Sequence, residues 1–321
     1  MTKTLTKNVP EQKTSECASQ RVWSATPTPL TSSGKIDVAS MQRVVTRHVA
    51  MGCEGMMLAG TCGEGPWLRR ADIEVLVRTG IELAGESIQV AVQVTDNSPG
   101  LILERLEMLA RWGVKMGVVA QPYFFLNSTP SRLREFYLEI WKQSPLPVLF
   151  YDRGKNATVP VPLEILEEVV SHPKVIGVKD SASERERFEA LKSVRRRRPE
   201  FRIFTGDEFR LMEMLRAGYD GAFTGGAIIT ARALQKCMEL FFAGEFEEAE
   251  KLDEEIKQVL LDIYGGPKIM CWLAGLKYSL IRLGVFTEWI NIPGYLLTDD
   301  CRKAIDRVTE QVEWLQEESL S

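Results

Sequence analysis

Eight short apolar runs, each followed by a segment of helical periodicity, constrain the fold of this chain more than any other feature. The runs lie at about residues 21–25, 55–60, 88–94, 115–120, 147–151, 175–179, 201–205 and 221–225. Between them, segments such as 38–51 and 99–112 carry apolar residues at helical spacing. An unbroken apolar run is typical of a strand buried on both faces, and strand–helix alternation predicts a parallel sheet.

Eight strand–helix units in about 210 residues predict a (β/α)₈ barrel, which is a TIM barrel. A doubly wound open sheet is the alternative, but it would more often carry a GxGxxG turn after an early strand, and the sequence has none. From about residue 230 onward the pattern is wholly helical. We therefore expect a flexible N-terminal arm at 1–20, a catalytic barrel at 21–229 and a C-terminal helical extension at 230–321.

Composition excludes several classes of partner. The chain is 45% hydrophobic and 26% charged, with a net charge of −4 and a pI of about 5.6. This balance offers no electrostatic basis for binding nucleic acid or an anionic membrane. No stretch of about 18 apolar residues occurs, so no membrane span is expected, and the polar first twenty residues lack the apolar region of a signal peptide.

The six cysteines are scattered through the sequence without a close pair. This pattern predicts free thiols in a reducing, cytoplasmic compartment rather than a disulfide framework or a zinc site. His48 and His172 are the only histidines, and they form no HxH or HExxH motif. We therefore expect no metal site, and structural roles for both histidines.

The run at 175–179 ends in Lys179, followed by Asp180 and Ser181. In a (β/α)₈ barrel the active site is built at the carboxyl ends of the strands. Partial burial there would disfavour the ammonium form and lower the pKa of Lys179. A neutral amine can attack a ketone and form a Schiff base. The alternative is a lysine that reaches into water or pairs with Asp180.

Two further features lie at predicted strand ends. Tyr151 ends the strand before that of Lys179, so the two residues are expected on adjacent strands, where a phenol could carry protons for Schiff-base chemistry. A packing role is the alternative for Tyr151. The loop at 60–65, Gly-Thr-Cys-Gly-Glu-Gly, offers backbone N–H groups that could hold a carboxylate, although such loops are also common as simple turns.

In combination, these motifs resemble the dihydrodipicolinate synthase / N-acetylneuraminate lyase family. The resemblance rests on the loop at 60–65, Pro122-Tyr123, Tyr151 and the segment 176–180, and it extends from about Trp23 to Gly226, more loosely through the helical tail. It implies a barrel with a helical extension, assembly into dimers or tetramers, and class I aldolase chemistry on pyruvate or another 2-oxo acid. No cofactor would be needed beyond the covalent Schiff base.

The same resemblance implies roles for individual residues. Lys179 would carry the Schiff base, Tyr151 would relay the proton, and Thr61 would link the relay through its hydroxyl. The backbone of Thr61 and Cys62 would hold the substrate carboxylate. By likeness to the lyase branch, further residues would bind the substrate and its hydroxyls: Ser181, Asp207, Glu208, Thr224 and Gly225. For Asp207 and Glu208, helix N-capping and first-turn charge are the alternative.

Three departures from the synthase pattern bear on the substrate. Phe124 stands where the synthases have a second tyrosine, Cys62 where they have threonine, and Asn156 where an arginine holds the carboxylate of the aldehyde. Arg153 is near that last position but displaced. Loss of a charged partner for a carboxylate is costly to recognition. We therefore favour a lyase or dehydratase acting on a 2-oxo acid such as a 2-keto-3-deoxy sugar acid.

Two alternatives remain at this point. One is dihydrodipicolinate synthase activity, in which pyruvate condenses with aspartate semialdehyde. The other is a non-catalytic barrel that binds a small 2-oxo acid.

Overall fold

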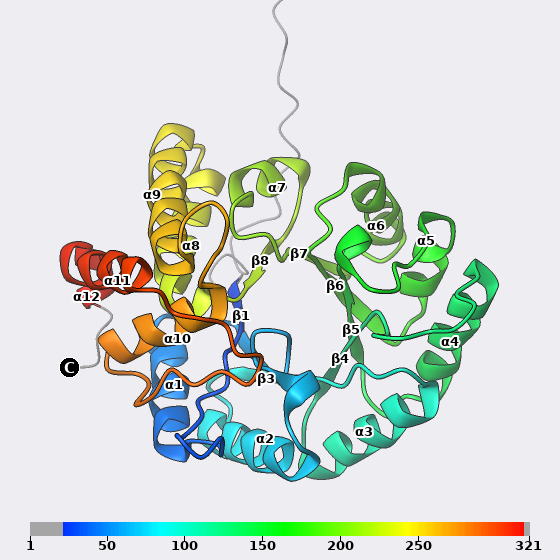
Figure 1. Cartoon of the computed structure of the whole chain (residues 1–321). Helices are drawn as coiled ribbons and strands as arrows, with labels where there is room; N and C mark the ends of the chain where they lie inside the picture. Colours follow the sequence, from blue (N-terminus) through cyan, green and yellow to red (C-terminus); the bar gives the residue numbers. More distant parts are fainter. Residues whose placement is uncertain (1–21, 318–321) are drawn as a thin grey trace, which may run out of the picture.

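The computed structural model describes residues 22–317 and forms a closed barrel of eight parallel strands (Figure 1). Each strand pairs with the next in sequence, and β8 closes the barrel against β1. The strands are β1 (Val22–Ala25), β2 (Gly55–Leu58), β3 (Gln89–Gln93), β4 (Met116–Ala120), β5 (Val148–Asp152), β6 (Val175–Asp180), β7 (Arg202–Thr205) and β8 (Gly221–Thr224).

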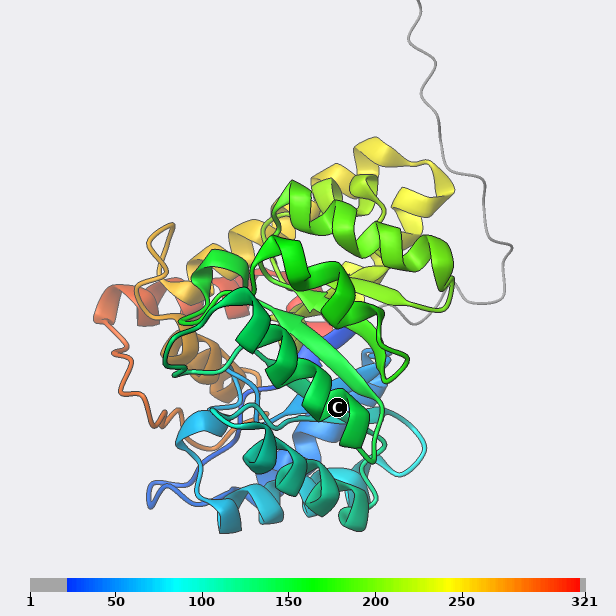
Figure 2. The same cartoon turned by 90° about the vertical axis from the view of Figure 1, so that its right-hand side faces the viewer.

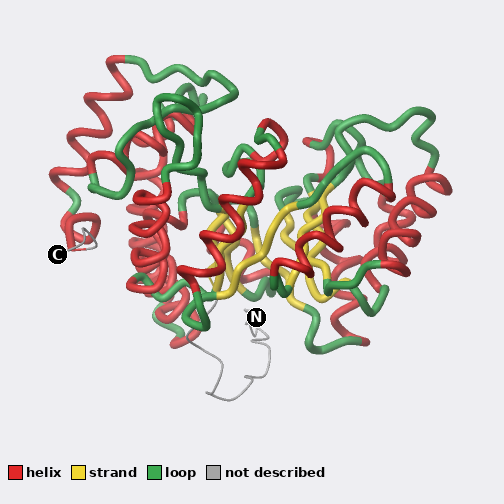
Figure 3. The backbone as a smooth tube through the Cα atoms, turned by 90° about the horizontal axis from the view of Figure 1, so that it is seen from below, coloured by secondary structure: helices red, strands yellow, loops and turns green. Residues whose placement is uncertain are grey.

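A helix follows each strand and lies outside the barrel, as the views along and across the barrel show (Figures 1 and 3). These helices are α1 (Val38–Ala50), α2 (Arg70–Ala84), α3 (Pro99–Trp112), α4 (Pro130–Gln143), α5 (Leu163–Ser171), α6 (Arg185–Arg197), α7 (Leu211–Ala217) and α8 (Ala227–Ala243). Short 3₁₀ turns lie at Gly65–Trp67 and Gly154–Asn156. The predicted (β/α)₈ barrel is confirmed.

Alternation along the strands builds two apolar cores, because successive side chains of a strand point to opposite faces. The inner core fills the barrel and includes Trp23, Met57, Tyr151 and Phe223. The outer core lies between the strands and the helices. At Gly55 a side chain would overlap the Trp23 ring, so the glycine leaves room for this tryptophan inside the barrel.

The chain ends in a helical extension, as expected. It consists of α9 (Phe246–Tyr264), α10 (Trp272–Arg282), α11 (Asp299–Gln311) and α12 (Glu313–Glu317). These helices lie together beside α8 and α1, on one side of the barrel (Figures 1 and 2). The predicted boundary between residues 229 and 230 falls inside α8, which packs against β1 and α1 as the eighth barrel helix.

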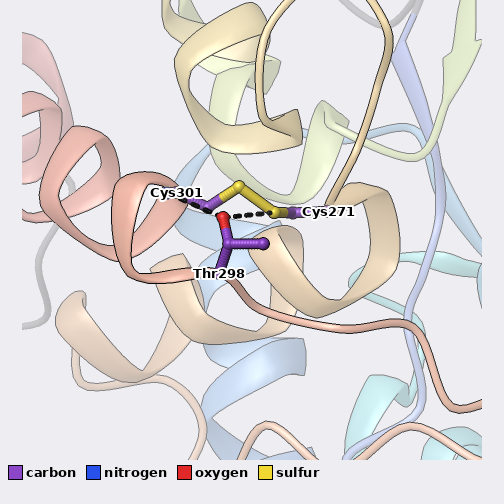
Figure 4. The surroundings of a disulfide bond; sticks show 3 residues. All are labelled: Cys271, Thr298 and Cys301. Atoms are coloured by element: carbon purple, nitrogen blue, oxygen red, sulfur yellow. Dashed lines mark hydrogen bonds between the residues drawn. A yellow bond between two sulfur atoms is a disulfide. The ribbon is translucent and has the colours of Figure 1, made fainter.

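The prediction of free thiols is wrong for two cysteines. Cys271 and Cys301 form a disulfide in the extension, with the Thr298 hydroxyl beside it (Figure 4). Cys271 directly precedes α10 and Cys301 lies in the first turn of α11. Packing of α10 against α11 brings the two helix starts together, which a separation of 30 residues does not reveal.

The sequence also led to expectations about the other cysteines, membrane spans and metal sites. Cys53, Cys62 and Cys237 are free thiols. Within residues 22–317, no helix is long and apolar enough to cross a membrane, and no group of three or more His, Cys, Asp and Glu residues could hold a metal ion. The predicted arm at 1–20, including Cys17, lies outside the described residues.

Candidate active site

Lys179 and Tyr151 lie side by side inside the carboxyl end of the barrel. They occupy paired register positions on the neighbouring strands β6 and β5, so both side chains point to the same face. Lys179 is only 4% exposed, and its Nζ lies 4.3 Å from the centre of the Tyr151 ring and 5.2 Å from that of Phe223. An amine in this aromatic, water-poor setting is well placed for nucleophilic chemistry.

Asp180 is not the partner of Lys179, because the next residue of a strand points to the opposite face. Its carboxyl accepts hydrogen bonds from Tyr219 Oη and from the backbone N–H groups of Ala182 and Ser183. Burial, together with the nearby Asp152, raises the pKa of Asp180 to about 6. Lys179 thus stays on the inner face, away from this carboxyl.

Asp152 lies on the same outer face as Asp180 and is bound by an arginine. Arg187 Nε donates to Asp152 Oδ2 at 2.7 Å, and both residues are buried. Gln121 Nε2 and the Gly154 N–H donate to Asp152 Oδ1 at 2.7 and 2.9 Å. This network anchors the end of β5 immediately behind Tyr151.

The glycine loop after β2 is tightly packed and anchored from outside the barrel. A side chain at Gly65 would overlap the Ala59 backbone, so only glycine fits there. Glu64, in the left-handed region at φ 58°, is buried and forms an ion pair with Lys277 of α10. Glu64 also accepts from the Ile292 N–H at 2.6 Å, and Lys277 donates to Ile290 O at 2.7 Å. The extension therefore fixes the loop that contains Thr61 and Cys62.

Cys62 packs against the inner core and against the loop after β8. An added Cβ at Gly225 would lie 2.7 Å from Cys62 Sγ and 3.5 Å from Glu208 Oε1. Burial raises the pKa of the Cys62 thiol to about 12, although Lys179 acts in the opposite direction. The thiol is therefore neutral at physiological pH and unsuited to act as a nucleophile.

Glu208 follows β7 and points toward the same region. Its carboxyl accepts from the Gly226 N–H at 2.8 Å and from Tyr264 Oη of α9 at 3.0 and 3.1 Å. Burial raises the pKa of Glu208 to about 7, against the opposing effect of these hydrogen bonds and of Lys179. A carboxyl with this pKa can give up or accept a proton near neutrality.

A cavity of about 320 Å³ opens beside these residues. Its lining comes from the loops after β6 and β7 and from the extension: Ser181, Gly206, Asp207, Glu208, Phe209, Tyr264, Ile269 and Trp272. An added Cβ at Gly206 would overlap Ser181 Oγ and lie 3.0 Å from Lys179 Cε. Two residues of the lining, Gly206 and Ser181, therefore lie close to the Lys179 side chain.

Neither Asp207 nor Glu208 is the N-cap of α7, because Arg210 occupies that position. Asp207 Oδ1 instead accepts from the Phe209 N–H at 3.0 Å and so closes a local turn. The capping alternative is wrong for both residues. Asp207 lines the cavity while one carboxylate oxygen serves the turn.

The structure does not bring all of the predicted residues together. Thr224 shares a strand face with Ala222, which packs in the outer core, whereas Phe223 faces the barrel interior. The Thr224 hydroxyl is buried without a hydrogen-bond partner among the described residues. Phe124 is 61% exposed, and Asn156 is exposed at the end of a 3₁₀ turn.

Three partners of buried carboxyl groups were not predicted from the sequence. Tyr264 contacts Glu208, and Arg187 contacts Asp152. Lys277 contacts Glu64. Each sits on a helix remote in sequence from its partner. A helical pattern reports which residues of a helix face the core, but not which loop they meet there.

Comparison with known proteins identifies the family of the chain. The model of the dihydrodipicolinate synthetase family matches residues 18–312. The chain belongs to this family. The 4-hydroxy-tetrahydrodipicolinate synthase of Stenotrophomonas maltophilia (strain K279a) is 26% identical over 230 residues, 72% of this chain and 76% of the relative. The enzyme of the same name from Pseudoalteromonas atlantica is 25% identical, over 83% of this chain and 89% of that relative.

Solved structures of the family share the fold. Dihydrodipicolinate synthase from Bacteroides thetaiotaomicron superposes with a TM-score of 0.83 at 24% identity, over 93% of this chain and 100% of the other. YagE, a prophage protein of the family from E. coli K12 solved in complex with pyruvate, gives a TM-score of 0.81 at 16% identity, over 91% and 97% of the two chains.

Proposed function

We propose that this protein is a Schiff-base-forming lyase that acts on pyruvate or another 2-oxo acid. The observation that carries the proposal is the buried pair of Lys179 and Tyr151 on adjacent strands, with Nζ 4.3 Å from the phenol ring centre. Membership of the dihydrodipicolinate synthetase family supports the same chemistry. The reaction uses the lysine itself and needs no separate cofactor.

In this mechanism the neutral amine of Lys179 attacks the C2 carbonyl of the substrate and forms a carbinolamine. Tyr151 donates its proton to the departing hydroxyl, water leaves, and an iminium remains bonded to Nζ beside the phenolate. The backbone N–H groups of Thr61 and Cys62 hold the substrate carboxylate, and the Thr61 hydroxyl links the proton relay. The cavity beside Ser181, Asp207 and Glu208 takes the rest of the substrate.

For the substrate, we propose a 2-oxo acid with hydroxyl groups, such as a 2-keto-3-deoxy sugar acid. Asn156 is exposed and neutral where the resemblance calls for an arginine, and Phe124 lacks the relay hydroxyl. A carboxylate on a partner aldehyde would therefore lack its charged partner. Condensation of pyruvate with aspartate semialdehyde is the second candidate, supported by the names of the relatives.

Borohydride trapping with pyruvate tests the proposal. We expect a pyruvyl adduct on Lys179, read by intact mass and peptide mapping, and no adduct with Lys179→Ala. Lys192→Ala is the matched control, because Lys192 lies on α6 and pairs with Glu189 at the surface. If neither pyruvate nor longer 2-oxo acids leave an adduct on Lys179, the lyase proposal fails and the non-catalytic barrel takes its place.

We also propose that the protein forms dimers or tetramers in the cytoplasm. Phe124 and Leu126, 61% and 68% exposed, form an apolar loop that supports contact between subunits. Sedimentation analysis of the wild type and of Leu126→Asp tests the assembly. Disulfides such as Cys271–Cys301 are more typical of oxidising compartments than of the cytoplasm. Fractionation of cells tests the cytoplasmic location directly.

A further inference from the structure

Lys179 is flanked by two different proton-carrying groups. Strand β6 lies between β5 and β7 in the barrel. On the β5 side, Tyr151 pairs in register with Lys179. On the β7 side, Glu208 follows the strand whose Phe204 pairs with Lys179. A substrate bonded to Nζ would therefore have a phenol on one side and a carboxyl group on the other.

The position of Glu208 is maintained by the extension and by backbone, not by a cation. Tyr264 Oη and the Gly226 N–H donate to its carboxyl. Within residues 22–317 no arginine or lysine forms an ion pair with Glu208, in contrast to Asp152 and Glu64. Burial without a counter-ion holds a fraction of this carboxyl protonated at neutral pH.

Glu208 also lies close to Cys62 and lines the cavity. The position of a Cβ at Gly225 is within 3.5 Å of both Cys62 Sγ and Glu208 Oε1, and the Cys62 backbone is proposed to hold the C1 carboxylate. Glu208 shares the cavity with Ser181, whose side chain lies beside Gly206 and Lys179 Cε. A substrate bonded to Nζ that extends past Gly206 and Ser181 would bring its later carbons, C4 among them, toward the cavity that Glu208 lines.

We propose that Glu208, held by the positioning residue Tyr264, donates the proton to a hydroxyl leaving C4, so that the enzyme removes water from a 4-hydroxy-2-oxo acid. This inference rests on the proposed Schiff-base function. It selects dehydration over cleavage of the carbon chain, and it assigns a role to Tyr264 in the reaction.

The steps balance without any further reactant. The Tyr151 phenolate takes a proton from C3, and the C–H electrons form the C2–C3 double bond of an enamine. The enamine nitrogen pushes these electrons toward C4, the C4–O bond breaks, and the leaving hydroxyl takes the proton of Glu208 to become water. A second water adds to the resulting conjugated iminium and returns a proton to Glu208. Collapse of the carbinolamine then frees Lys179 and the unsaturated 2-oxo acid.

Elimination needs a base at C3 and an acid at C4, and these must be two groups in different protonation states. Cleavage of the C3–C4 bond needs only one group, to remove the proton of the C4 hydroxyl. Tyr151 and Glu208 are two separate proton-carrying groups on the two sides of Lys179, and so they can divide these roles.

The test compares Glu208→Gln, Tyr264→Phe and the control Tyr278→Phe. Tyr278 Oη donates to Asp306 Oδ1 at 3.0 Å on the extension, outside the cavity, so its loss matches the chemical change at Tyr264. The probe is 2-keto-3-deoxyhexonate, supplied as both C4 epimers. Loss of one water is followed by mass spectrometry, and pyruvate trapping on Lys179 is measured for every variant.

We expect the wild type and Tyr278→Phe to dehydrate one epimer, with activity that falls as the pH rises above about 7. Glu208→Gln should lower kcat by about 10²-fold or more, the usual contribution of a general acid, and retain pyruvate trapping. Tyr264→Phe removes a donor to the carboxylate, which raises the pKa of Glu208 and moves the falling limb of the profile to higher pH.

Three results would overturn this inference while leaving the Schiff-base proposal intact. They are a Glu208→Gln variant within threefold of wild type, conversion of the probe to pyruvate and an aldehyde, and pyruvate trapping without turnover of either epimer. If pyruvate is not trapped on Lys179 at all, the proposed function fails, and this inference with it.

Discussion

The carboxyl groups on the two sides of Lys179 have different kinds of partner. Behind β5 and β6, Asp152 is buried against Arg187 and accepts two further hydrogen bonds. Above β7 and β8, the partners of Glu208 within residues 22–317 are Tyr264 and a backbone N–H group, and its pKa rises to about 7. A cation therefore satisfies the first carboxylate, whereas burial without an ion-pair partner raises the pKa of the second into the neutral range.

The direction of the side chains explains this division. Asp152 and Asp180 follow Tyr151 and Lys179 by one residue, so they point outward to the helices while Tyr151 and Lys179 point inward. Glu208 lies beyond the end of its strand and is free of this alternation. It therefore lines the proposed substrate cavity, which the two aspartates do not.

The largest expected effect concerns the ion pair between Arg187 and Asp152 on the outer face of the barrel. Arg187→Met should destabilise the fold by about 3–5 kcal/mol, because it leaves Asp152 buried without its cation. Urea denaturation measures the change, with Arg196→Met on the exposed face of the same helix as the control. The double variant Asp152→Asn/Arg187→Met should recover part of the loss. Equal stability of Arg187→Met and the control would show that the ion pair does not hold β5.

The next largest effect concerns the disulfide of the helical extension, which carries Tyr264, the partner of Glu208. Reduction of the Cys271–Cys301 disulfide, which closes a loop of 30 residues, should lower stability by about 3 kcal/mol. Thermal unfolding with and without reductant measures this loss. The variant Cys271→Ser/Cys301→Ser should unfold like the reduced wild type and show no response to reductant. A response in that variant would assign the effect to another thiol.

The smallest effect is the pH dependence that Glu208 imposes on stability. Its folded-state pKa of about 7 lies above the ordinary value of 4.5, so the folded state binds more protons than the unfolded state between these values. Stability from this group is complete below about pH 4.5 and is lost as the pH rises toward 7, by at most about 3 kcal/mol.

Glu208→Gln removes this dependence. The difference in unfolding free energy between Glu208→Gln and wild type should therefore grow with pH between about 4.5 and 7, in favour of the variant. Asp180, with a pKa of about 6, contributes a slope of the same sign to both proteins and cancels in the comparison. A constant difference across this range would mean that Glu208 stays charged in the folded protein, and would contradict the raised pKa.

The sequence by itself determined the strand order, the barrel and the pairing of Tyr151 with Lys179. Apolar runs and helical spacing are local patterns, and residues at the ends of consecutive parallel strands must be neighbours. Ser181, Asp207 and Glu208 line one cavity because all three follow β6 or β7 at the carboxyl end of the barrel, and their contact with substrate stays a prediction.

Only the tertiary structure decided which partner each of these groups receives. Tyr264 meets Glu208, Lys277 meets Glu64 and Cys271 meets Cys301 because α9, α10 and α11 fold back beside α8 and the mouth of the barrel. These contacts depend on how helices pack rather than on spacing along the chain. The ionisation of each carboxyl group depends on its partner. The sequence can therefore identify an acidic residue, but the fold determines whether that residue is charged.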